Sequence, residues 1–237
     1  MPLTGAHCAA CGQKAAKRLT LRDVLKETWE RLRLFEGKAA TTLRALVTGP
    51  GTLARGYVLG RRTKVMHPLT LLIALVAILV ATLAINGYFT RYAGGPDAGL
   101  KRMADQVLAY ANWSFTLGIA AVFLGSWSVF RRRLGYNAVE HAVLAIYVQC
   151  LVLAVVIVNM IPTLIWRDAA FVVAHKAASA WYLYAIKLAI VAFAYRQFFL
   201  LSWRRDWLRL AAATLVYLAA SWLLLRAYAA AILWFVG

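Results

Sequence analysis

The chain has 237 residues, of which 63% are hydrophobic and only 15% are charged. A mean hydropathy of +0.67 is outside the range of water-soluble domains, in which about half of the residues are apolar. The charges are unbalanced, because 27 Lys and Arg face 9 Asp and Glu, for a formal net charge of +18. The composition therefore excludes an ordinary soluble domain and predicts a membrane protein with anionic partners.

The first motif is a Cys-x-x-Cys formed by Cys8 and Cys11. This spacing can place two thiolates on one zinc ion, but a closed zinc site needs four ligands. The third cysteine, Cys150, lies deep in a later apolar run and cannot reach this motif. A full site within one chain, a knuckle without metal, a zinc site completed by a second chain and a redox pair all remain open. We predict no cofactor, and zinc only if further ligands complete the knuckle.

Residues 1–66 form a basic region with 13 Lys and Arg, 4 Asp and Glu and no run long enough to span a membrane. The region lacks the apolar core of a secretory signal, so we expect it to stay in the cytoplasm. Helical periodicity predicts amphipathic helices over 20–35, 39–47 and 52–59, and Gly49-Pro50-Gly51 predicts a break between the last two. We expect these helices to lie in the membrane interface. Alternatively, their charges serve only to hold the topology.

Five apolar segments in residues 67–237 are long enough to cross the bilayer: 68–89, 110–130, 139–166, 171–199 and 207–236. Twenty of the 27 basic residues fall on one side of these spans and five on the other. Because Lys and Arg near span ends are retained in the cytoplasm, the N-terminus is predicted inside and the C-terminus outside. The fold class is an all-α, polytopic membrane helix bundle. The last span contains Arg226 and is expected to be continuous, the alternative being a helix that breaks there.

A first candidate site lies at the inner end of the third span, where Glu140 and His141 follow Asn137. The structural interpretation is a capping box, in which Asn137 caps the helix and Glu140 bonds back to it. The functional interpretation is an anion or lipid pocket, with Glu140 and His141 as proton carriers. The anion-binding or lipid-binding residues expected there are Arg55, Arg61, Arg62, Arg131, Arg132, Arg133 and Asn137.

A second candidate site lies inside the membrane. Lys187 is about eleven residues from Lys176 and nine from Arg196, so it should lie near the midplane, where a lysine costs about 3 kcal/mol on insertion scales. Gln149, beside Tyr147 and Cys150, should reach a similar depth. We predict that Lys187 donates to Gln149 or Tyr147 inside the bundle, either as a structural contact or as a functional polar site.

Three local patterns resemble domain-of-unknown-function family 3667, a group of uncharacterised bacterial membrane proteins with an N-terminal zinc-ribbon-like piece. They are Cys8-Ala-Ala-Cys11-Gly-Gln-Lys; then Thr42-Leu-Arg-Ala-Leu-Val-Thr-Gly-Pro50-Gly with Arg55-Gly-Tyr57-Val-Leu-Gly60-Arg61-Arg62 and His67-Pro68; and Tyr136-Asn137-Ala-Val-Glu140-His141. The resemblance implies a multi-pass protein of the bacterial inner membrane and carries no agreed activity.

We therefore predict a protein that binds or moves an anionic lipid or small anion at the cytoplasmic leaflet, or a membrane subunit of a complex. The alternative is a membrane-embedded enzyme acting on a lipid-linked substrate, with Glu140 and His141 as acid and base. The expected partners are an anionic lipid or membrane surface, and a homo-oligomer or protein complex is compatible with the sequence. Nucleic acid is not an expected partner, because nucleic-acid modules do not need five apolar spans.

Overall fold

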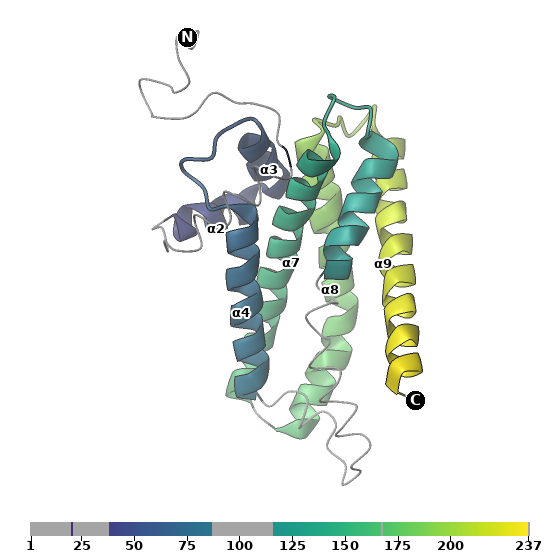
Figure 1. Ribbon diagram of the computed structural model, residues 1–237. Coiled ribbons are helices and arrows are strands. Elements are labelled where there is room, and N and C mark those ends of the chain that lie inside the picture. Colours follow the sequence, from purple (N-terminus) through teal and green to yellow (C-terminus); the bar gives the residue numbers. More distant parts are fainter. Residues whose placement is uncertain (1–19, 21–37, 87–115, 167, 237) are drawn as a thin grey trace.

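The computed structural model describes residues 20, 38–86, 116–166 and 168–236 (Figure 1). The Cys8–Cys11 motif and nearly all of the helix predicted over 20–35 lie outside these residues. Within them the secondary structure is entirely helical, which confirms the all-α prediction for this part of the chain. The helices are α2 (Ala39–Thr48), α3 (Pro50–Val58), α4 (Pro68–Asn86), an unlabelled helix Thr116–Phe130, α7 (Ala138–Ile165), α8 (Ala169–Phe198) and α9 (Trp207–Val236).

Four of the described helices are long and apolar enough to cross a membrane: Pro68–Ile85, Ala138–Ile165, Ala170–Phe198 and Trp207–Tyr228. They match four of the five predicted spans. Of the remaining span, 110–115 lie outside the described residues, and Thr116–Phe130 is a shorter apolar helix. Five spans and an inside N-terminus therefore stay predictions. The last span is continuous through Arg226, whose guanidinium lies over the Trp222 ring at 4.3 Å.

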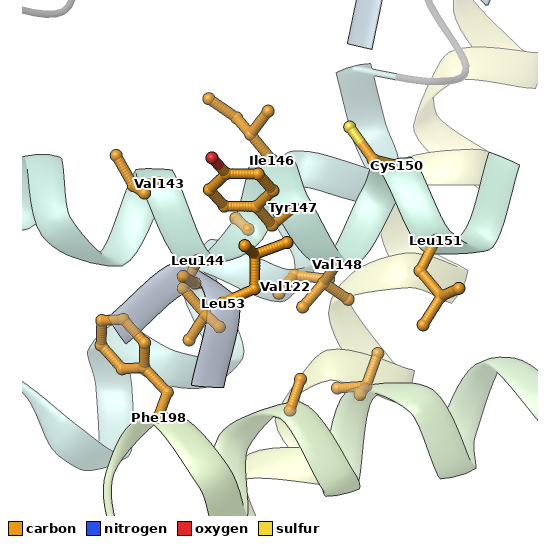
Figure 2. Close-up of a cluster of buried hydrophobic side chains, with 14 of the residues drawn as sticks. Leu53, Val122, Val143, Leu144, Ile146, Tyr147, Val148, Cys150, Leu151 and Phe198 are labelled. Atoms are coloured by element: carbon orange, nitrogen blue, oxygen red, sulfur yellow. The ribbon is translucent and has the colours of Figure 1, made fainter. Parts of the chain in front are cut away.

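The long helices run side by side, with α2 and α3 at the end where Thr116–Phe130 connects to α7 and α8 connects to α9 (Figure 1). Helix α4 packs on α7, α7 on α8, and α8 on α9. The most buried part of the core lies where α7 meets α3, α8 and the Thr116–Phe130 helix, around Tyr147, Leu53, Val122 and Phe198 (Figure 2). Helix α7 is thus the central helix against which the others are placed.

Helix α3 begins earlier than its sequence pattern predicts. Gly49 is the N-cap and Pro50 occupies the first helical position, where its fixed φ and missing N–H cause no loss. The N–H groups of Gly51 and Thr52 donate to Oε1 of Gln197, at 3.0 and 3.3 Å. The predicted break is therefore the point at which α2 ends and α3 begins, and a side chain of α8 caps the new helix.

The apolar face of α3 is covered by α7 and α8 rather than open to lipid. A Cβ at Gly51 would overlap the backbone carbonyl oxygen of Ala194, so only glycine allows α3 to approach α8 this closely. The buried side chains of this helix include Leu53, Ala54 and Tyr57. Helix α3 is therefore a packed element of the bundle, although its sequence pattern suits an interfacial helix equally well.

Two glycines, Gly118 and Gly125, let the Thr116–Phe130 helix approach its neighbours closely. A Cβ at Gly118 would overlap the side-chain amide of Gln149, and a Cβ at Gly125 would overlap the Tyr195 hydroxyl. That hydroxyl donates to the carbonyl of Val122 at 2.7 Å. The described part of this helix is thereby held between α7 and α8.

Candidate functional site

Basic side chains are concentrated at one end of the bundle. Of 16 Lys and Arg among the described residues, 13 lie in α2, α3 or the helix ends and loops at that end. The described carboxylates there are Glu140 and Asp206. We call this region the Arg-rich end; its basic residues are Lys38, Arg44, Arg55, Arg61, Arg62, Lys64, Arg131, Arg132, Arg133, Arg196, Arg204, Arg205 and Arg209.

One of the predicted anion-binding residues, Arg61, lines a pocket of about 290 Å³ between α2 and α3. Thr48 and Thr52 also line it, and Gly49 and Gly56 keep it open. The Thr48 hydroxyl donates to the carbonyl of Arg44 at 2.9 Å. The pocket thus offers one exposed guanidinium and the Thr52 hydroxyl beside glycines and apolar side chains such as Leu53 and Val65, and these two donors suit a small anionic group.

The neighbouring predicted arginines have partial contacts with the protein. Arg62 Nε donates to the carbonyl of Tyr57 at 3.3 Å, and its guanidinium lies 5.3 Å from the centre of the Tyr57 ring. Arg55 is half-buried, and its Nε has no hydrogen-bond partner within the described segments. Hydrogen bonds to Met66 hold the segment between α3 and α4: its N–H donates to Thr42 Oγ1 at 2.9 Å, and its carbonyl accepts from the Tyr147 hydroxyl at 2.7 Å.

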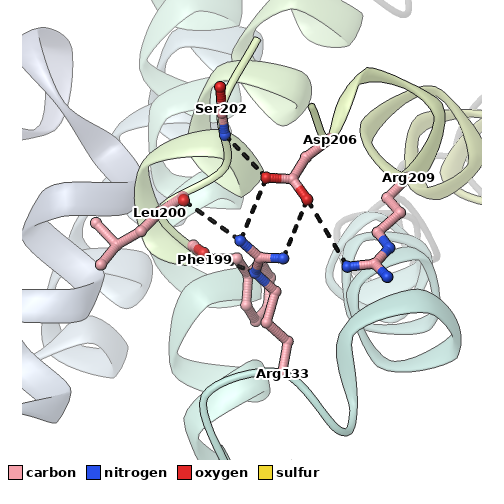
Figure 3. A network of polar contacts seen from close by, with 6 residues as sticks. All are labelled: Arg133, Phe199, Leu200, Ser202, Asp206 and Arg209. Carbon is pink, nitrogen blue, oxygen red and sulfur yellow. Dashed lines mark hydrogen bonds and ion pairs between the residues drawn. The ribbon is translucent and has the colours of Figure 1, made fainter. Parts of the chain in front are cut away.

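Arg133 has a structural role at the α8–α9 turn (Figure 3). Its guanidinium makes a two-pronged ion pair with Asp206, at 3.1 and 3.3 Å, and also donates to the carbonyls of Phe199 and Leu200. The backbone N–H of Ser202, together with Arg133, holds the pKa of Asp206 below its usual range. Arg131 and Arg132, by contrast, are exposed. The three adjacent arginines are therefore not equivalent, and two of them remain available to a ligand.

Glu140 and Asn137 form the predicted capping box at the start of α7. The N–H of Glu140 donates to Asn137 Oδ1 at 3.0 Å, and the N–H of Asn137 donates to Glu140 Oε2 at 2.7 Å. The Glu140 side chain is buried. These contacts confirm the structural interpretation of the motif and account for the spacing of the two residues.

His141 is fully buried between aromatic rings. Its ring centre lies 5.2 Å from those of Trp127 and Phe199, and Nδ1 is 2.9 Å from Ser126 Oγ. Because the Ser126 hydroxyl donates to the carbonyl of Phe123 at 3.0 Å, we assign the imidazole proton to Nδ1. Nε2 is buried and has no hydrogen-bond partner in the part of the chain that the structure describes. Neither His141 nor Glu140 lines the Arg61 pocket.

Inside the bundle, Lys187 and Gln149 line one cavity of about 260 Å³, between the Thr116–Phe130 helix, α7, α8 and α9. Tyr184, Tyr217 and Ser221 line it as well. Tyr147, the other proposed partner of Lys187, is not part of this lining and donates to Met66 instead. Lys187 and Gln149, which were predicted to lie at a similar depth, thus line the same cavity. Tyr147 faces the opposite side of α7.

Sequence reasoning missed several residues of these sites. Tyr184 precedes Lys187 by three residues, and this spacing could have placed it on the same helix face as Lys187. Ser221 precedes its nearest basic residue, Arg226, by five residues. No local pattern identifies Ser126, Gln197 or Asp206, since their partners are distant in sequence.

No cluster of three or more His, Cys, Asp or Glu that could hold a metal occurs in the part of the chain that the structure describes. A family model described as "Protein of unknown function (DUF3667)" matches residues 36–80. This segment comprises α2, α3, the Arg61 pocket and most of α4, and the match confirms the family resemblance there. No curated protein and no solved structure matches the chain.

Proposed function

We propose that this membrane protein binds or moves an anionic lipid headgroup or small anion at the membrane surface beside its Arg-rich end. The observation that carries the proposal is the local excess of 13 basic residues over two carboxylates. Asp206 accepts from Arg133 and also lies 3.7 Å from Arg209, and Glu140 caps α7. Most of the cations at this end therefore have no carboxylate to neutralise them among the described residues.

The Arg61 pocket is the favoured place for the anionic group. Guanidinium and hydroxyl donors suit phosphate oxygens, and basic residues near an anionic leaflet gain about 1 kcal/mol each. By the rule that cytoplasmic loops are rich in Lys and Arg, this end faces the cytoplasm, and the bacterial inner membrane is the proposed location.

The test is native mass spectrometry of the full chain with phosphatidylglycerol and with zwitterionic phosphatidylcholine. We expect a preference for phosphatidylglycerol that declines at high salt. Arg61→Glu should weaken phosphatidylglycerol binding by at least about fivefold, since it removes one cation and adds an anion. Arg131→Glu and Arg132→Glu should show smaller losses.

The matched control is Lys176→Glu, because Lys176 is exposed at the other end of α8. Arg133 is left unchanged, since its loss would disrupt the α8–α9 turn. Equal binding of both lipids, or equal losses from Arg61→Glu and Lys176→Glu, would contradict the proposal.

A further inference from the structure

The cavity around Lys187 contains polar side chains whose hydrogen-bonding groups are not used by the described protein. Lys187, Gln149, Tyr184, Tyr217 and Ser221 all line it. Across the described residues, none of these five side chains makes a hydrogen bond or ion pair. For Gln149, which is only 6% exposed, this is unusual, because buried amides nearly always have partners. A molecule within the cavity would satisfy them.

These groups lie at similar depths, within about one helical turn of one another. Counted from the Arg-rich end, Gln149 is 11 residues into α7 and Lys187 is 11 residues from the end of α8, which places both about 16 Å along their helices. Ser221 is 14 residues into α9, or about 21 Å. The polar groups therefore face one another from three helices near the middle of the bundle.

The chemistry of the lining is donor-rich. A lysine ammonium has three N–H donors and no acceptor, the Gln149 amide has two donors, and each hydroxyl adds one. Among the described residues, no carboxylate lines the cavity. A cation inside a membrane normally pairs with an anion or faces water. Here the lining provides the cation and the donors but no anionic partner.

We propose that this cavity binds an oxyanion, either phosphate or carboxylate, with Lys187 as its counter-ion and Gln149, Ser221 and the two tyrosines as hydrogen-bond donors. The volume of about 260 Å³ is slightly below the usual range of small-ligand pockets, roughly 300–1,000 Å³. It fits an anionic group with a few waters, not a whole lipid. Tyr184 and Leu225 line the cavity and are each 45% exposed on the outer surface of α8 and α9, so the remainder of an amphiphile can lie outside.

This proposal does not depend on the Arg61 pocket, which is formed by other helices. It is tested by native mass spectrometry of the full chain in a neutral detergent, with inorganic phosphate, dodecyl phosphate, dodecanoate and uncharged dodecanol as probes. We expect Lys187→Met to weaken binding of the anionic probes by at least about tenfold, the effect of losing one charge-assisted contact. Lys176→Met, the same substitution in the same helix, should change binding by less than about twofold, because an exposed charge is screened by solvent.

Two further variants keep the test independent of folding. Lys187→Arg should retain binding, and Gln149→Leu should weaken it by about threefold while removing an unpaired buried amide. Binding of dodecyl phosphate without inorganic phosphate identifies an amphiphile as the ligand, and the reverse result identifies a free anion. Dodecanol binding as tight as dodecyl phosphate, or unchanged anion binding in Lys187→Met and Gln149→Leu, would overturn the proposal. We expect Arg61→Glu to leave the Lys187-dependent part of anion binding unchanged. Failure of the Lys187 cavity can therefore be distinguished from failure of the Arg61 pocket.

Discussion

The contact between α3 and α8 gives the sharpest prediction about stability, which concerns Gly51→Ala. The new methyl group would overlap the carbonyl oxygen of Ala194 and the Cβ of Gln197. Neither atom can move without shifting the backbone of α8, because one is main chain and the other is attached directly to it. We therefore expect α3 to move away from α8 and weaken the bond from the Gly51 N–H to Gln197, now 3.0 Å long.

The size of the effect follows from two opposing terms. Overpacking a close contact costs typically about 1–3 kcal/mol, whereas alanine in place of glycine gains about 0.5–1 kcal/mol within a helix. Subtracting the gain from the cost leaves a net loss of up to about 2.5 kcal/mol, with a central value of about 1 kcal/mol, which corresponds to a fall in Tm of roughly 2–4 °C for a chain of this size.

The assay is thermal unfolding of the purified chain in detergent, followed by tryptophan fluorescence. The matched control is Gly56→Ala in the same helix, where a Cβ would meet only Arg61 Cδ, at 3.9 Å. This control should unfold at the wild-type temperature or slightly above it. If Gly51→Ala is as stable as Gly56→Ala, α3 does not pack on α8 as described.

Three other predictions concern individual polar contacts, each measured by Tm. The pKa of Asp206 is lowered from its ordinary value of 3.8, so the contribution of Asp206 to stability is present above that pH and is lost as the pH falls through the folded-state pKa. Asp206→Asn should therefore lower Tm at neutral pH and make Tm fall less steeply in acid. An unchanged dependence of Tm on pH would contradict this. Asn137→Ala removes the cap of α7 and should cost about 1 kcal/mol, whereas an unaltered Tm would mean that the capping box contributes nothing. Ser126→Ala leaves the buried Nδ1–H of His141 without an acceptor and should cost about 1–3 kcal/mol, with Ser128→Ala, a change of the same kind in the same helix, as a smaller-effect control.

Local patterns predicted local structure well. The Asn-x-x-Glu spacing at Asn137 and Glu140 is enough to specify a capping box, because both partners lie in one helical turn. The depth of Lys187 and Gln149 followed from counting residues along two antiparallel helices, which fixes height but not direction around the helix axis. The same counting could not show that Tyr147 faces away from Lys187.

Contacts between distant segments could not be predicted in this way. The amphipathic pattern of α3 requires an apolar surface against its buried face, but lipid and protein satisfy that requirement equally. Arg133 and Asp206 are 73 residues apart, and nothing in the three-arginine run distinguishes Arg133 from its neighbours. Long-range pairing depends on how the helices pack, which a single sequence does not state.

The described carboxylates all have structural roles, and this links the two proposed sites. Glu140 caps α7, Asp168 caps α8 by accepting from the N–H of Phe171 at 3.2 Å, and Asp206 fixes the α8–α9 turn through Arg133. The same part of the chain carries 16 Lys and Arg. Its excess positive charge must therefore be balanced by groups other than these three. Solvent and lipid headgroups can do this at the Arg-rich end, where most of the cations are exposed. Lys187 lies about 16 Å along α8 from that end, and the proposed oxyanion would provide the balancing charge in its cavity.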